Sequence, residues 1–118
     1  MKKLLVSTIL IFIGITSFAQ NKNATAILDV DGVCMMCKER IEKASIKTKG
    51  VKSAVWNVKT HVLNVMYDGR KTDLATISKN IAAVGHDTKT IKASDEAYNS
   101  VHPCCLYRDD EVMKDHKN

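Results

Sequence analysis

Four cysteines, arranged as two close pairs, are the residues best able to do chemistry in this 118-residue chain. Cys34 and Cys37 are separated by two methionines in the stretch DGVCMMCKER, and Cys104 and Cys105 are adjacent in NSVHPCCLY. Thiolates are soft ligands that suit Cu(I) and Zn(II), and a Cys-x-x-Cys pair can also exchange disulfides. A disulfide within either pair would close only a tiny loop, which restricts the unfolded chain little and makes a poor structural staple.

The sequence leaves the pairing of these cysteines open. Long-range disulfides between the two pairs would still be possible, and four cysteines allow three connectivities. A direct bond between Cys104 and Cys105 is disfavoured by strain. Redox proteins of the thioredoxin type usually place a cis-proline loop against the cysteine pair, whereas Pro103 is the only proline here and lies in the tail. This favours metal capture over a thiol–disulfide redox protein or a structural adaptor with oxidised cysteines.

The N-terminal stretch MKKLLVSTILIFIGITSFAQ has the form of an export signal. Two lysines precede an apolar run at residues 4–15, and a small-x-small motif follows at residues 17–19. We therefore predict a signal peptide at residues 1–19, cleavage before Gln20, and a periplasmic or otherwise exported protein. The alternative is an uncleaved membrane anchor, but the run is shorter than the roughly 18 to 20 residues that span a bilayer.

The hydrophobic pattern predicts the elements that must position the first cysteine pair. Alternation predicts strands, spacing of three and four predicts helices, and the segment 51–67 has the pattern of a hairpin. Thr72 or Asp73 can cap the second helix, and Gly50 and Gly85 suit helix ends. In order, we expect a strand at 24–30, a helix at 37–49, the hairpin at 51–67, a helix at 74–84 and a strand at 88–93.

This β-α-β-β-α-β order predicts an α+β, ferredoxin-like fold with an antiparallel four-stranded sheet and two helices on one face. It places Cys34 on a loop and Cys37 at the start of a helix, where the positive end of the helix dipole stabilises a thiolate. The expected core consists of Leu28, Val30, Ile41, Ala44, Trp56, Val58, Leu63, Val65, Leu74, Ile77, Ile81 and Val84.

The stretches DGVCMMCKERIEKA, GVKSAVWNVKTHVLNVMYD and AVGHD together resemble the heavy-metal-associated domain over about residues 24–93. We assign this domain to residues 20–93 and a C-terminal extension to residues 94–118. The resemblance implies a non-enzymatic protein with an exposed two-cysteine site, which takes Cu(I) or Hg(II) and passes it on by ligand exchange. Cys34 and Cys37 match the family's two ligands. Together with the export signal, the layout is similar to copper chaperones and to the periplasmic mercuric-ion-binding protein. Cu(I) is the favoured ion, with Hg(II) or Zn(II) as alternatives.

Three residues around the first pair depart from or elaborate the family pattern. The family usually has Gly-Met-x-Cys, but here Gly32 stands two positions before Cys34 and no methionine matches. Met36 could supply a thioether to a soft ion. The family often places a tyrosine, lysine or histidine where His86 stands, so we expect His86 near the metal as a weak third ligand or hydrogen-bond donor. His61, in the hairpin turn on the opposite side of the pattern, is expected to be a surface residue.

The C-terminal extension is too apolar around residues 98–107 to be a plain disordered tail. We expect it to dock on the domain, with the last ten or so residues frayed. The last strand should end away from the loop that holds Cys34, called the metal loop below. Ten extended residues reach about 33 Å, so the chain is long enough to return to that loop. Cys104 and Cys105, with His102, could then form a second soft-metal site, join the first pair, or pair with it oxidatively; alternatively they are structural.

Composition excludes other functions. The formal net charge is +5, the lysines are scattered, and the few aromatic residues are not interleaved with arginine, so nucleic-acid binding is not expected. No nucleophile–base pattern indicates hydrolysis. The expected partners are a soft metal ion and a membrane metal transporter or another metal-binding protein, docked near Lys38 and Arg40. The protein is expected to be a monomer.

Overall fold

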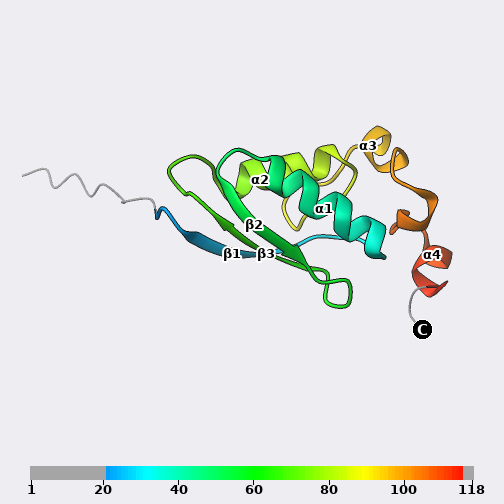
Figure 1. The fold of residues 1–118 in the computed structure, drawn as a ribbon. Coiled ribbons are helices and arrows are strands. Elements are labelled where there is room, and N and C mark those ends of the chain that lie inside the picture. Colours follow the sequence, from blue (N-terminus) through cyan, green and yellow to red (C-terminus); the bar gives the residue numbers. More distant parts are fainter. Residues whose placement is uncertain (1–20, 116–118) are drawn as a thin grey trace, which may run out of the picture.

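A computed structural model describes residues 21–115. Three strands, β1 (Ala24–Asp29), β2 (Val51–Trp56) and β3 (Val62–Tyr67), form an antiparallel sheet in the order β1-β3-β2. Two helices, α1 (Met35–Lys47) and α2 (Leu74–Ala83), lie together on one face of this sheet (Figure 1). The arrangement confirms the ferredoxin-like plan. Residues 1–19, assigned to a signal peptide, lie outside the described residues.

Strand alternation separates the two faces of the sheet. Leu28, Trp56, Leu63 and Val65 point to the helices and are buried. Their neighbours, such as Ile27, Val55 and Met66, point to the other face and are exposed. The helices contribute Ile41, Ile77 and Ile81, which are fully buried. This is the period-two burial expected for a sheet covered on one side only.

The predicted core is largely confirmed. Val58, Leu74 and Val84 are only half-buried, whereas the other predicted core residues are buried. These three stand at or beyond the ends of their elements, where the packed layers open to solvent. The second helix is capped by Asp73, whose Oδ1 accepts a hydrogen bond of 2.8 Å from the Thr76 backbone N–H.

The prediction of a fourth strand at 88–93 is wrong, because almost none of this segment pairs with the sheet. Within residues 21–115 it is reduced to a single antiparallel bridge between Val30 and Thr88. The chain crosses beside β1 as expected, since the Asp31 N–H donates to the Asp87 carbonyl at 2.9 Å. It then turns at once, because the Thr88 side chain bonds both the N–H and the carbonyl of Ile91. Local side-chain bonding to the backbone therefore replaces a strand ladder.

The C-terminal extension docks on the domain, as expected. It contains α3 (Asp95–Asn99), the 3₁₀ helix η1 (Pro103–Cys105) and α4 (Asp110–Asp115). Its buried residues Tyr98, Val101, Cys105 and Tyr107 belong to the same core as the sheet and helices. Figure 1 shows the extension passing the end of the domain where α1 begins. The expected fraying is not seen at residues 110–115, which form α4, and residues 116–118 lie outside the described part.

The early turn also changes how the extension reaches the metal loop. The Ala93 N–H donates to Asp87 Oδ1 at 2.7 Å, so the chain is already back beside residue 87 before α3 begins. The long extended return that the sequence suggested is therefore not needed.

Among the described residues, no helix is both long enough and apolar enough to cross a membrane.

Candidate metal centre

The loop between β1 and α1 holds the first cysteine pair. Cys34 takes the N-cap position of α1 with extended backbone, and its carbonyl accepts a 3.0 Å hydrogen bond from the Lys38 N–H. The helix thus begins at Met35, two residues earlier than expected. Cys37 lies inside its first turn and is fully buried. Both sulfurs therefore lie at the positive end of α1.

Trp56 lies beneath this loop and fixes its path. Its indole N–H donates to the Val30 carbonyl at 3.0 Å. A Cβ atom on Gly32 would lie 2.9 Å from Trp56 Cζ2 and 3.1 Å from Cys37 Cβ, so only glycine fits there without displacement. Val33 is buried in the core cluster beside these residues. Trp56 from β2 and the loop's own Val33 thus fill the space beneath a loop that lacks the family's usual methionine.

The four cysteine sulfurs lie together, with Cys34 at the centre. Its Sγ lies 3.6 Å from that of Cys37, 3.5 Å from that of Cys104 and 3.4 Å from that of Cys105. The Sγ atoms of Cys104 and Cys105 are 3.9 Å apart. All four cysteines are free thiols. The second cysteine pair therefore lies against the first pair and does not form a separate cluster elsewhere.

The four thiols differ in burial and in acidity. Although partial burial opposes its ionisation, the nearby Cys37 backbone N–H and hydrogen bonds from the Cys105, Cys104 and Cys37 thiols lower the pKa of Cys34 to about 7. Burial raises the pKa of the other three thiols, and the proximity of Cys34 adds to this rise. Cys34 and Cys104 are half-buried, whereas Cys37 and Cys105 are buried. Cys34 is therefore the accessible thiolate, which is the nucleophilic and metal-binding form.

Two further predicted site residues lie at the exposed rim of this cluster. The Met36 thioether sulfur is 3.5 Å from Cys104 Sγ, and the His102 Nδ1 is 3.1 Å from the same sulfur. The His102 ring also caps η1 by accepting from the Cys104 N–H at 3.3 Å. The structure therefore brings both residues to the cysteines, and their binding of an ion remains a prediction.

His86 lies at the expected end of the fold but is fully buried. Its Nδ1 is 2.9 Å from the Asp31 carbonyl, and its ring stacks on Tyr107 with centroids 5.6 Å apart. Its Nε2 has no hydrogen-bond partner within residues 21–115. Burial lowers the pKa of this imidazole, so it is neutral at pH 7. These contacts give His86 a part in holding the metal loop, and its role as a third ligand remains a prediction.

Tyr107 joins the extension to the loop after α2. Its hydroxyl donates to the Gly85 carbonyl at 2.8 Å and accepts from the Asp87 N–H at 2.9 Å. Gly85 has a φ of +103°, and a Cβ there would lie 2.6 Å from both the Ala97 carbonyl oxygen and Val101 Cγ1. This glycine therefore serves both the left-handed turn and the close approach of α3.

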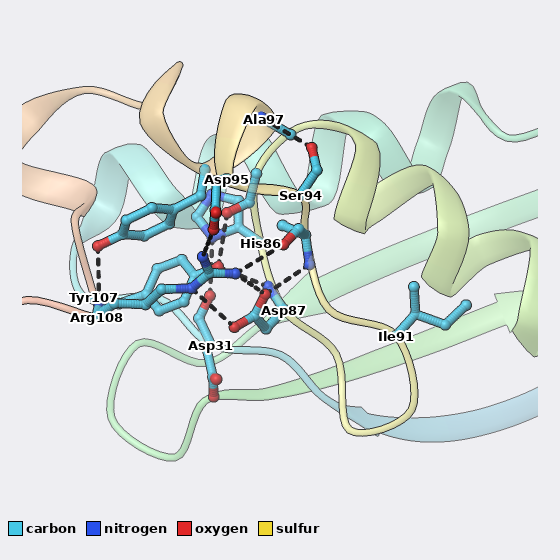
Figure 2. A network of polar contacts seen from close by, with 12 residues as sticks. Asp31, His86, Asp87, Ile91, Ser94, Asp95, Ala97, Tyr107 and Arg108 are labelled. Atoms are coloured by element: carbon cyan, nitrogen blue, oxygen red, sulfur yellow. Dashed lines mark hydrogen bonds and ion pairs between the residues drawn. The ribbon is translucent and has the colours of Figure 1, made fainter.

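Arg108 completes this junction (Figure 2). Its guanidinium NH2 group donates to Asp87 Oδ1 at 2.8 Å and to the Ala93 carbonyl at 2.9 Å. The same guanidinium lies over the Tyr98 ring, 4.3 Å from its centroid. Although partial burial opposes ionisation of the Asp87 carboxyl, the bonds from Arg108 and the Ala93 N–H lower its pKa. The residues flanking Cys105 are thus anchored by contacts that involve no sulfur.

The expectation for His61 is wrong. Because β1 and β3 are antiparallel, with Asp29 opposite Val62, the hairpin turn lies at the metal-loop end of the sheet. The His61 carbonyl accepts from the Val30 N–H at 2.9 Å. Its ring is half-buried and stacks on Trp56, with centroids 5.5 Å apart. Strand direction, which the local sequence pattern does not show, decides this position.

The two basic residues expected at a docking face are engaged within the molecule. The Lys38 ammonium pairs with Glu42 and donates to the Trp56 carbonyl at 2.9 Å. The Arg40 guanidinium donates to the Val84 carbonyl at 2.6 Å and to the Ser100 hydroxyl at 3.3 Å. Arg40 therefore ties α1 to both α2 and the extension.

Comparison with known proteins agrees with this geometry. Residues 27–87 match the model of the heavy-metal-associated domain. The chain belongs to this family. This heavy-metal-associated protein is 37% identical over 71 residues to a copper-exporting P-type ATPase of Staphylococcus saprophyticus, and 33% identical over 82 residues to one of Bacillus subtilis. These matches cover 59% and 69% of this chain but only 9% and 10% of the ATPases.

Solved structures of the same fold include a metallochaperone and MerP. The CopZ metallochaperone is 32% identical, with a TM-score of 0.54 over 55% of this chain and 98% of its own. Oxidized MerP from Ralstonia metallidurans is 28% identical, with a TM-score of 0.55 over 57% of this chain and 94% of its own. The family match ends at residue 87, so Tyr107, Arg108 and the second cysteine pair lie beyond it.

Sequence reasoning missed the residues that hold the extension in place. Asp87, Tyr98, Tyr107 and Arg108 were not recognised as contributors to the site. The signal available was the set of apolar residues around the second cysteine pair, which indicated that the extension docks but not where: Tyr98, Val101, Leu106 and Tyr107. Val33 was also missed, because it lies in a loop and follows no strand or helix period.

Proposed function

We propose that this protein is exported and captures a soft metal ion, Cu(I) above all, through the thiolates of Cys34 and Cys37, and that it transfers the ion by ligand exchange. The observation that carries the proposal is the pair of sulfurs 3.6 Å apart at the start of α1, in a domain of the heavy-metal-associated family. The donor set fits such an ion, because thiolates prefer Cu(I), Hg(II) and Zn(II) over hard ions such as Mg(II).

Cys34 is suited to be the first ligand. It is accessible and has the most acidic of the four thiols, so it offers a thiolate near neutral pH. Cys37 lies behind it, buried, and would displace the ion's previous ligand in a second step. Each thiol that binds releases its proton to solvent, and no electron is transferred.

The choice of Cu(I) is supported by the copper proteins among the relatives, namely the copper-exporting ATPases and the CopZ metallochaperone. Hg(II) is the alternative, because the resemblance to the heavy-metal-associated domain implies either ion. The proposed partner is a membrane metal transporter or another metal-binding protein, which takes the ion at the exposed edge of Cys34. Export is supported by the signal-like sequence at residues 1–19.

The test is a competition between the reduced protein and a chromogenic Cu(I) chelator under anaerobic conditions. We expect one tightly bound Cu(I) per chain in the unaltered protein, and its loss in a Cys34→Ser/Cys37→Ser variant. Equal copper retention by the two proteins would reject the assignment.

The redox alternative predicts a different result. A thiol–disulfide oxidoreductase would reduce insulin at a rate that depends on Cys34, and its dithiol would have a potential in the range of known exchange proteins. We expect no insulin reduction above background. A structural adaptor with oxidised cysteines would instead show no free thiols when isolated from its native compartment.

A further inference from the structure

The second cysteine pair lies at the first one although 70 positions separate Cys34 from Cys104. Cys34 Sγ lies 3.4 to 3.6 Å from each of the other three sulfurs, and the Sγ atoms of Cys104 and Cys105 are 3.9 Å apart. A disulfide needs about 2.05 Å, so these are non-bonded contacts. Cys34, Cys104 and Cys105 form a group whose sulfurs all lie within 4.8 Å of one another.

These spacings can be compared with metal–thiolate geometry. For a metal–sulfur bond of about 2.3 Å, two sulfurs on opposite sides of one ion lie about 4.6 Å apart, three around it about 4.0 Å and four about 3.8 Å. The observed spacings of 3.4 to 3.9 Å are nearer the three- and four-sulfur values than the two-sulfur value. The cluster is therefore shaped for more than two sulfur ligands.

The position of the second pair does not depend on the thiols themselves. Tyr107, two residues after Cys105, is fixed by its hydroxyl bonds to Gly85 and Asp87. Arg108 is fixed by Asp87 and Ala93. Pro103 opens η1 and the His102 ring caps it, which sets the turn carrying both cysteines. Preorganised side chains of this kind are what a metal site requires.

An ion also has a path to the cluster. Cys34 and Cys104 are partly exposed, whereas Cys37 and Cys105 are buried. A surface groove beside them is lined by Met36, Arg40, His102 and Cys105, together with Glu39 and Lys43. The groove thus reaches the buried Cys105, and Cys34 and Cys104 are partly open to solvent.

We propose that Cys104 and Cys105 are metal ligands, and that Cys34 binds one soft ion together with both of them rather than with Cys37 alone. This inference rests on the function proposed above and deepens it. A site with three or four thiolates holds the ion more tightly and shields it from solvent, so its release to a partner is slower than from a two-cysteine site. The extension therefore slows the transfer of the ion without preventing it.

The test uses Cu(I) as the probe and X-ray absorption at the copper edge as the readout. We expect three or more sulfur neighbours in the unaltered protein and two in a Cys104→Ser/Cys105→Ser variant. Competition with a chromogenic chelator should show at least a tenfold loss of Cu(I) affinity in that variant. Two sulfur neighbours and the same affinity in both proteins would overturn the inference while leaving the proposed function intact.

A second measurement needs no variant and covers the case in which the double serine protein fails to fold. Bound Cu(I) should protect the partly exposed Cys104 from alkylation, read residue by residue by mass spectrometry. Alkylation of Cys104 at the same rate with and without Cu(I) would overturn the inference. If the unaltered protein bound no Cu(I) at all, both the proposed function and this inference would fall together.

Discussion

The Sγ atom of Cys105 lies 3.4 Å from the Sγ atom of Cys34, closer than the 3.6 Å that separates Cys34 from its motif partner Cys37. The thiol of the family motif is therefore in contact with a residue from outside the family domain, which matches residues 27–87. The metal end of this protein consists of the domain and its extension together, so variants that loosen the extension are expected to alter the cysteine cluster.

Replacing Arg108 with alanine should loosen the extension. The change removes the hydrogen bonds to the buried Asp87 carboxylate and the Ala93 carbonyl, at a cost of about 2 kcal/mol in the free energy of unfolding. It should also raise the rate at which Cys104 reacts with a maleimide, because η1 is no longer held. Denaturant unfolding and timed alkylation measure the two effects.

Arg70 provides a matched control for Arg108. Its side chain bonds Asp68 at 2.8 and 3.0 Å, two residues away in sequence and far along the chain from the extension. Arg70→Ala should lower stability while leaving Cys104 reactivity unchanged. If both variants changed the alkylation rate equally, the effect would be general destabilisation rather than release of the extension.

Tyr107→Phe should cost about 1 to 3 kcal/mol of stability. The tyrosine hydroxyl satisfies the Gly85 carbonyl and the Asp87 N–H, both buried with it, and phenylalanine would leave these groups unpaired. The control is Tyr67→Phe at the end of β3, because the Tyr67 hydroxyl makes no hydrogen bond within residues 21–115. In urea unfolding, Tyr107→Phe should lower the free energy of unfolding more than Tyr67→Phe does. An equally small decrease in both variants would contradict the role of the Tyr107 hydroxyl.

His86 should make stability depend on pH below neutrality. Burial lowers its pKa, an effect partly opposed by the Asp31 carbonyl and increased by Arg40. Because the folded pKa lies below the unfolded value of about 6.5, the neutral imidazole contributes its full stability above that pH. This contribution is lost as pH falls through the folded pKa, since the unfolded chain then binds the extra proton.

The measurement compares the unaltered protein with His86→Phe, which keeps an aromatic ring against Tyr107 but cannot titrate. We expect the variant to be less stable near pH 7.5 because it lacks the bond to the Asp31 carbonyl. The difference should shrink below pH 6.5 by up to about 1.4 kcal/mol per pH unit. A difference that stays constant between pH 7.5 and pH 5 would rule out titration of His86 as its source.

Gly32→Ala should disturb the metal loop directly. The new Cβ would lie 2.9 Å from Trp56 Cζ2 and 3.1 Å from Cys37 Cβ, and overpacking of this kind costs about 1 to 3 kcal/mol. We also expect weaker Cu(I) binding, because Cys37 must move. In a Trp56→Phe background, which lacks the ring atoms in conflict, the same glycine change should cost less. If Gly32→Ala lowered the free energy of unfolding by the same amount in both backgrounds, Gly32 and Trp56 would not be coupled.

Local pattern was sufficient to predict the first three strands and the two helices that cover them. The alternation of Leu63 and Val65 and the spacing of Ile77 and Ile81 follow the periods of strands and helices, and these residues are buried as expected. The fourth strand could not be judged in this way, because the Thr88 side chain forms a turn with Ile91 that competes with strand pairing. The position of His61 also escaped prediction, since it depends on the direction in which β3 runs beside β1.

The sequence by itself determined the Cys-x-x-Cys motif, its place between a strand and a helix, and the family, because these depend on residues close together in the chain. Only the tertiary structure decided that Cys104 and Cys105 lie against Cys34. That contact depends on Tyr107 and Arg108 meeting Gly85 and Asp87, residues about twenty positions away. Long-range burial and hydrogen bonding of this kind produce no periodic pattern in a sequence, because such contacts form only when the packed core brings distant segments together.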